Sequence, residues 1–244
     1  MVALIAALLN IVPSAAHAQN TIISQPTTIR NGLSAPHVIV ASTLTLESGV
    51  LSCETLTVVP DAKVVFIGGA VRINTLEVAQ GGKIEFFHAV PFAVNRTILA
   101  GTLDLGNAFS IHTRWQPKEL LPDASGKYGT IRLRNNALPS FDSPWNGEVC
   151  FYGGEPIVLH TPAKFRHLTL DGVSVHFDRV EIEGILHLSG GDLYVVNHLS
   201  LNGGILRQGD EKISVVGKHA EVAVGGLRGA SIVTDLPKRG GTAL

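Results

Sequence analysis

The chain has 244 residues, of which 45% are hydrophobic, and its formal net charge is -1. This near-neutral balance excludes the basic excess that recruits nucleic acid and gives no sign of an acidic tail. Glycine is frequent, with 26 residues, and long runs with helical spacing are missing after the N-terminus. The composition therefore indicates strands and turns, in one large domain or two small ones.

The first segment, residues 1–18, has the form of a signal peptide. Its apolar run, Val2–Val12, is too short to span a bilayer as a helix, and Pro13 follows it. Ala-His-Ala then places small residues at the two positions that a signal peptidase reads, so we expect cleavage after Ala18 and a secreted or cell-surface location. No Lys or Arg precedes the apolar run, and a buried N-terminal strand or helix is the alternative. No later stretch predicts a transmembrane helix.

Residues 19–113 alternate apolar and polar residues in short segments separated by turns. A period of two over three to five residues predicts strands with one buried face. Similar segments recur, because LTVV begins at Leu56 and LEVA begins at Leu76, twenty residues later. A repeat of this length, built from short strands, is typical of a solenoid, in which each turn buries its apolar face against the next.

The pattern weakens over residues 114–148. This stretch contains four prolines and both tryptophans, Trp115 and Trp145, and alternation persists only in TIRLR at 130–134. We interpret it as a loop-rich insert between two solenoid stretches, where long loops with aromatic residues often carry function. The alternative is that the two indoles only cover an end or a side of the coil.

Residues 149–244 return to the repeating pattern and end abruptly, as expected of a fragment of a longer protein. Short alternating segments are interrupted by DG, EG, SGGD and NGG, whose glycines accept positive φ. LTL begins at Leu168 and LHL at Leu186, eighteen residues later. The whole pattern predicts an all-β chain, a right-handed parallel β-helix. A β-sandwich is the alternative, but its strands are longer and its turn signals less dense.

The segment FRHLTLDGVSVHFDRVEIEGILHLSGGDLYVVNHLSLNGGIL resembles the repetitive stalks of large secreted bacterial surface proteins, in particular Bacteroidetes gliding and type IX-secreted proteins. The likeness lies in Leu168–Gly172, Val180–Leu188 and Gly191–Gly204. VIVASTLTLESGVLSCETLTVVPDAKVVF is similar to the first turns of parallel β-helices in the same group. The C-terminal sorting domain that such proteins usually carry is not evident. The resemblance implies a surface or extracellular structural role and no particular catalytic residues.

Evidence for catalysis is weak. Parallel β-helices also host polysaccharide lyases and hydrolases, which need carboxylates or basic residues converging from adjacent turns. The candidate acids are Asp171, Asp178, Glu181, Glu183, Asp192 and Asp210. Asp171 and Asp192 are turn residues beside glycine, and Glu181 and Glu183 share the solvated face of a strand. No motif pairs them, so no catalytic residue is assigned.

No metal site or cofactor is predicted either. Histidines are frequent in the C-terminal half, and His176 and His187 are expected to point outward, but no HxH, HExxH or zinc-ligand spacing occurs. No glycine-rich phosphate loop is present. Two cysteines, Cys53 and Cys150, either pair as a disulfide after export or are isolated small hydrophobic residues, and the sequence leaves both open.

Together these patterns predict an exported, non-catalytic structural or adhesive β-solenoid module at the bacterial cell surface. Stacked strands would form a stiff rod, and the exposed aromatic residues Trp115, Trp145 and Tyr152 are the candidate contacts to a cell-surface glycan or another protein. The alternatives are a parallel β-helix polysaccharide lyase or hydrolase, and the shaft of a larger surface-displayed effector. The sequence indicates no oligomeric state.

Overall fold

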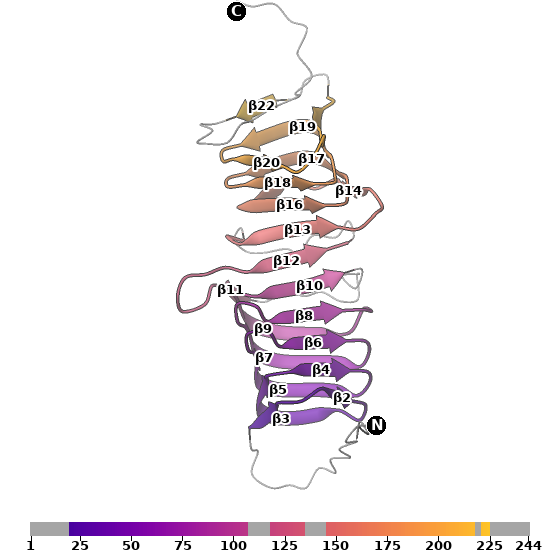
Figure 1. Cartoon of the computed structure of the whole chain (residues 1–244), viewed down its shortest axis with the longest axis vertical. Helices are drawn as coiled ribbons and strands as arrows, with labels where there is room; N and C mark the ends of the chain where they lie inside the picture. The colour runs from indigo at the N-terminus through magenta and orange to yellow at the C-terminus, as the bar shows by residue number, and fades with distance from the viewer. Residues whose placement is uncertain (1–19, 107–117, 135–144, 218–220, 225–244) are drawn as a thin grey trace, which may run out of the picture.

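The computed structural model describes residues 20–106, 118–134, 145–217 and 221–224, and the regular structure in these ranges is entirely β-strand. The strands form three sheets and stack as the successive turns of one coil (Figure 1). Neighbouring strands pair in parallel throughout, as between β5 and β7 or β16 and β18. The predicted parallel β-solenoid is thereby confirmed. The sandwich alternative is wrong, since it requires antiparallel strands in two facing sheets.

Each turn of the coil contributes one or two strands to each sheet in which it takes part. The first six-stranded sheet contains β1 (Thr21–Ile23), β3 (Leu33–Val40), β5 (Val50–Val58), β7 (Ala70–Val78), β9 (Phe92–Leu99) and β11 (Glu119–Leu121). The ten-stranded sheet contains β2 (Thr27–Ile29), β4 (Thr43–Leu46), β6 (Lys63–Phe66), β8 (Lys83–Phe86), β10 (Thr102–Gly106), β12 (Thr130–Leu133), β13 (Glu148–Tyr152), β16 (His167–Asp171), β18 (Leu186–Ser189) and β20 (Ile205–Arg207). The second six-stranded sheet contains β14 (Ile157–Leu159), β15 (Ala163–Phe165), β17 (Val175–Ile182), β19 (Leu193–Leu201), β21 (Ile213–Val215) and β22 (Glu221–Val224).

The long strands bend at a polar corner. In β5, the buried positions shift from Leu51 and Cys53 to Leu56 and Val58, so the alternation skips a step near Glu54. Two inward-facing halves therefore meet at an angle, and the shorter strand of the ten-stranded sheet closes the third side of each turn. The alternation that predicted strands is thus retained within each half.

Amide and carboxylate side chains stack at this corner. The Asn74 amide donates to the Glu54 carboxylate at 2.6 Å, and the Asn95 amide donates to the Asn74 oxygen at 2.8 Å. The same arrangement recurs further along the coil, where Asn197 donates to Asp178. These hydrogen bonds link one turn to the next and help to fix the register between turns.

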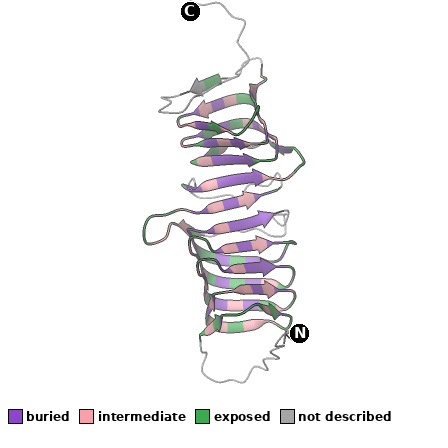
Figure 2. Ribbon diagram, viewed as in Figure 1, coloured by how far each residue is buried: buried purple, intermediate pink, exposed green. Residues whose placement is uncertain are grey.

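The core runs along the axis of the coil (Figure 2). It consists mainly of Leu, Val and Ile, with two clusters of aromatic rings. Phe66, Phe86 and Phe92 form one cluster, with ring centroids 4.8 to 5.9 Å apart. The second cluster is built from Phe151 and two further phenylalanines. Each turn thus buries its apolar face against its neighbours, as the repeat predicted.

The ten-stranded sheet runs unbroken through the stretch that we interpreted as an insert. β11 pairs with β9, and β12 pairs with both β10 and β13, so residues 118–134 continue the coil. At a parallel-strand spacing of about 4.8 Å, the ten strands make a sheet roughly 43 Å long. The remainder of the insert, residues 114–117 and 135–144, and the expected signal peptide lie outside the described residues.

Candidate functional site

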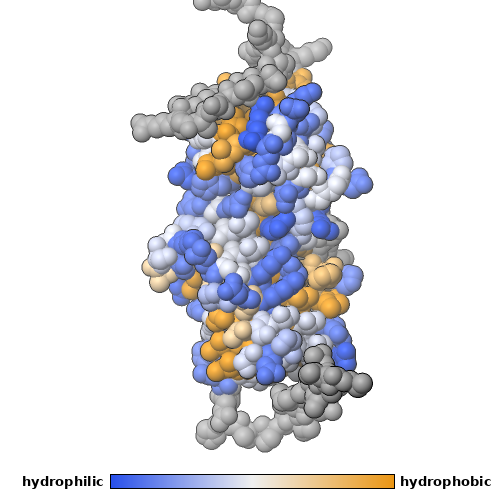
Figure 3. Space-filling model, in the orientation of Figure 1, coloured by the Kyte–Doolittle hydropathy of each residue, from blue (hydrophilic) through white to orange (hydrophobic). Residues whose placement is uncertain are grey.

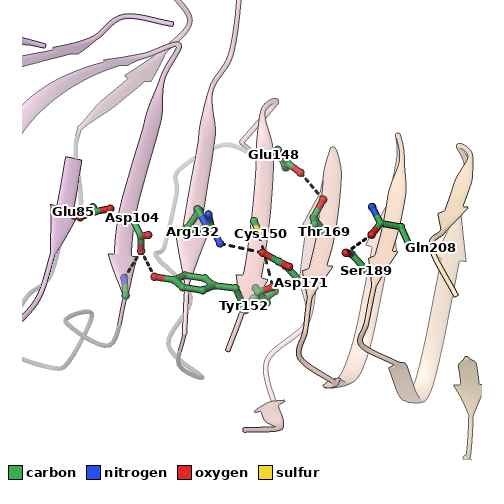
Figure 4. Close-up of polar contacts among 12 residues, drawn as sticks. Glu85, Asp104, Arg132, Glu148, Cys150, Tyr152, Thr169, Asp171, Ser189 and Gln208 are labelled. Atoms are coloured by element: carbon green, nitrogen blue, oxygen red, sulfur yellow. Dashed lines mark hydrogen bonds and ion pairs between the residues drawn. The ribbon is translucent and has the colours of Figure 1, made fainter. Parts of the chain in front are cut away.

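The outer face of the ten-stranded sheet carries a band of polar side chains. Because the parallel strands pair in register, outward residues of successive turns form a column that follows the coil axis. The central column consists of Glu85, Asp104, Arg132, Cys150, Thr169 and His187. Figure 4 shows five of them, Glu85, Asp104, Arg132, Cys150 and Thr169, on successive strands of this sheet. We call this band the polar face.

Tyr152 occupies the middle of the polar face. Its side chain reaches back across β12, and its hydroxyl donates to the carboxylate of Asp104 on β10 (Figure 4). The guanidinium carbons of Arg132 and Arg134 lie 4.2 and 4.5 Å from the centroid of its ring. Arg132 also pairs with Asp171 at 3.1 Å. Four neighbouring strands thus contribute to one cluster of two arginines, a tyrosine and two carboxylates.

The carboxylates of the polar face are already engaged with its own residues. Glu85 lies 2.5 Å from the ammonium groups of both Lys63 and Lys83. Glu148 accepts hydrogen bonds from Thr130, at 2.8 Å, and from Thr169. Apart from the Lys83–Glu85 pair, which lies within β8, these contacts join adjacent turns, as cross-strand pairs do in a sheet. They also leave these carboxylates less free to act on a bound molecule.

The pKa values of the Tyr152 hydroxyl and the Cys150 thiol argue against a nucleophile or a base on the polar face. Burial raises the pKa of the Tyr152 hydroxyl, and its hydrogen bond to Asp104 raises it further. Burial raises the pKa of the Cys150 thiol to about 12. Both groups are therefore protonated near neutral pH, where an anionic nucleophile would need the opposite shift.

The aromatic residues predicted as contacts lie in different environments. Tyr152 is half-buried on the polar face. Trp145, expected to be exposed, is instead only 4% exposed, packs edge-on against Tyr128 at 5.1 Å and donates to the Glu148 carbonyl at 3.3 Å. Its large apolar ring gains more from the core than from solvent, which favours the covering role that the sequence had offered as the alternative. Trp115 lies outside the described residues.

The two cysteines do not pair in the structure. Cys53 lies in β5 of the first six-stranded sheet and Cys150 in β13 of the ten-stranded sheet, and both are buried free thiols. Their strands belong to turns that are separated by several intervening turns of the coil, whereas a disulfide requires Cα atoms within about 7 Å. The alternative interpretation, that Cys53 and Cys150 are isolated small hydrophobic residues, fits this arrangement.

The candidate acids of the C-terminal half do not converge on one place. Glu181 and Glu183 both pair with Lys164, at 3.6 and 2.8 Å, on the second six-stranded sheet and just beyond it. Asp178 belongs to the corner, and Asp192 accepts from the Lys212 backbone at 2.7 Å. Asp171 alone reaches the polar face. Within the described ranges, no group of three metal-ligating side chains comes together.

Sequence reasoning missed the residues that meet Tyr152. Asp104 lies 48 positions before Tyr152, and Arg132 lies 39 positions before Asp171. The turns between them differ in length and include the stretch that appeared irregular. The one available signal was the TIRLR alternation, which places Arg132 on the outer face of β12 and Arg134 directly after the end of this strand.

Replacing Glu85 with glutamine is expected to reduce the sensitivity of the fold to acid. Burial raises the pKa of Glu85, but the hydrogen bonds from Lys63 and Lys83 outweigh this, and the pKa lies below its ordinary 4.5. A lowered folded-state pKa contributes stability above pH 4.5 that is lost as the pH falls through the folded value. Urea unfolding from pH 7 to pH 3 should show a shallower decline for Glu85→Gln, by less than about 1 kcal/mol.

The matched control is Glu155→Gln, which changes a carboxylate on an exposed turn. It should leave the pH profile of the parent protein unchanged. Identical profiles for Glu85→Gln and the parent would contradict the role of the lysine pairs.

Comparison of the chain with protein-family models, with curated protein sequences and with solved structures finds no match. In the ranges that the structure describes, no helix has the length and apolar character needed to cross a bilayer. The proposals below therefore rest on the residues and their geometry.

Proposed function

We propose that the chain is an exported, non-catalytic β-solenoid module with a structural or adhesive role at the bacterial cell surface. The observation that carries this is the ten-stranded sheet, which runs unbroken along the coil while its outer carboxylates pair with residues of adjacent turns. Such a surface stiffens a rod and displays polar groups at regular spacing. Residues 165–206 resemble the stalks of secreted surface proteins, including Bacteroidetes type IX-secreted proteins, which agrees with this role.

A second candidate function is a parallel β-helix enzyme that acts on polysaccharide. The observation in its favour is the convergence of Asp104, Arg132, Tyr152 and Asp171 from four neighbouring strands. Against it stand the raised pKa of Tyr152 and the existing partners of both aspartates. The structural or adhesive role therefore ranks first.

Export is tested with a C-terminally tagged full-length chain in a Gram-negative host, beside the same chain without residues 1–18. We expect the full chain outside the cytoplasm, with Gln19 as its first residue by mass spectrometry, and the shortened chain inside. An uncleaved full-length chain that stays in the cytoplasm would contradict the proposal.

The adhesive and enzymatic roles are separated with purified residues 19–244. The protein is passed over immobilised polysaccharides and extracellular matrix proteins, and each soluble polysaccharide is then analysed for shortened chains. Retention without shortening is the expected result. Shortened products that disappear in Asp104→Asn and Tyr152→Phe would place the enzyme first, whereas no retention and no products would leave a purely structural rod.

A further inference from the structure

Arg134 differs from the other cations of the polar face because it has no carboxylate partner among the described residues. Lys63 and Lys83 share Glu85, and Arg132 pairs with Asp171. Arg134 is exposed, and among the described residues it has no ion pair within 4.0 Å. Its guanidinium is instead positioned by the ring of Tyr152, 4.5 Å from the centroid.

One hydrogen-bond donor beside Arg134 has no partner among the described residues. The Nε atom of Arg132 is shielded from solvent and has no hydrogen-bond partner among the described residues. The nearest carboxylates are already engaged: Asp104 accepts from Tyr152 and from the Gly106 amide at 3.0 Å, and Asp171 accepts from Arg132. Two guanidinium groups thus lie against one tyrosine ring, and among the described residues only that of Arg132 has a carboxylate within 4.0 Å.

We propose that Arg134, Tyr152 and Arg132 form a binding site for the acidic groups of an anionic glycan. A planar guanidinium matches carboxylate or sulfate in a two-point contact, which ammonium groups do not reproduce. Tyr152, held by its hydroxyl at Asp104, fixes the orientation of Arg134 before the ligand arrives, which lowers the entropic penalty of binding. Arg134 makes the direct contact, and Arg132 and Tyr152 support it.

The surroundings of the site favour a glycan chain over a compact ligand. The site lies on a sheet face whose outward residues are mostly hydrophilic over β10 to β13, beside an apolar area at the ends of β6 and β8 (Figure 3). Exposed Ile67 and Phe87 follow those two strands. A sugar polymer presents hydroxyls, acidic groups and apolar ring faces together, so it can contact both areas along the coil.

This inference rests on the adhesive half of the proposed function and is tested with purified residues 19–244. The probes are polygalacturonate, dextran sulfate and neutral dextran, and binding is measured by biolayer interferometry at fixed salt. The variants are Arg134→Ala and Arg134→Lys. Arg72→Ala serves as the matched control, since Arg72 is an exposed arginine on the outer side of β7.

The parent protein should bind one or both anionic probes and not neutral dextran. Arg134→Ala should weaken that binding at least about tenfold, as expected for a charge-assisted contact. Arg134→Lys should restore it only in part, and Arg72→Ala should leave it unchanged. The stronger of the two probes identifies carboxylate or sulfate as the preferred group. Circular dichroism of each variant checks that the fold is retained.

Three outcomes would overturn the inference. Equal losses of binding in Arg134→Ala and Arg72→Ala would mean that the anionic probes are attracted to positive charge in general and that no specific site exists. If the protein binds neutral dextran and Arg134→Ala does not alter that binding, the proposed anionic site does not exist, but the adhesive function is retained. Retention of none of the probes or of the matrix proteins would remove both the site and the adhesive role, and would leave the structural role.

Discussion

Replacing Phe151 with alanine is expected to lower the free energy of unfolding by about 3–5 kcal/mol. Phe151 is fully buried in β13, and its ring meets Phe165 and Phe177 edge-on, with centroids 6.3 and 6.2 Å away. The strands that carry these rings are hydrogen-bonded to strands of neighbouring turns, β13 to β16 and β15 to β17. The core therefore has little freedom to close the cavity that the ring would leave.

The control for this change is Phe87→Ala, in which a ring that is 61% exposed is removed from the surface. Its effect should stay within about 0.5 kcal/mol. Guanidinium unfolding followed by circular dichroism measures both variants. Because a solenoid is stabilised by contacts between neighbouring turns, hydrogen exchange should show the loss of protection centred on β13, β16 and β17. Equal losses of stability in the two variants would contradict the packing described here.

The repeat could be predicted from the sequence down to individual residue pairs. Leu56 and Leu76, twenty residues apart, are direct partners in β5 and β7, and Leu168 and Leu186, eighteen apart, are partners in β16 and β18. Inward residues must be apolar and recur at a fixed spacing, so they produce a periodic pattern in the sequence. The corner at Glu54 leaves a weaker trace, because a single skipped step in the alternation is easily read as the end of one strand.

The candidate site was much harder to predict. Outward residues face solvent, where many side chains are tolerated, so no periodic pattern marks the polar face. Which outward residues become neighbours depends on the length of every turn between them, and the turn that joins Asp104 to Arg132 includes residues outside the regular repeat. Tyr152 was identified as an exposed aromatic residue, but its partners became visible only with the register of β10, β12 and β13.

Trp145 shows the limit of reading function from composition. A tryptophan among prolines resembles a loop residue that contacts a ligand, yet this one is buried beside Tyr128. The deciding fact is that residues 118–134 rejoin the sheets, which gives the coil an apolar interior at this level as well. A large ring next to such an interior gains about 1.5–3 kcal/mol by entering it.

Replacing Gly203 with alanine is expected to destabilise the C-terminal turns by about 3 kcal/mol, near the upper end of typical overpacking effects. A Cβ atom at Gly203 would lie 1.8 Å from the carbonyl oxygen of Gly184 on the preceding turn. The obstacle is backbone, which cannot rotate aside as a side chain can. Gly184 is itself confined, because a Cβ there would lie 2.5 Å from the Arg166 carbonyl oxygen. Gly184 of the EG segment and Gly203 of the NGG segment thus mark places where consecutive turns approach each other closely.

The adjacent glycine provides a control that differs by one position. A Cβ atom at Gly204 would meet no atom within 4 Å. Gly204→Ala should therefore leave the stability unchanged or raise it by up to about 1 kcal/mol, because alanine reduces the entropy of the unfolded chain. Thermal unfolding of both variants measures the difference directly. Equal melting temperatures would show that the turns are not in contact at Gly203, and the tight stacking of the coil would then have to be revised at this turn.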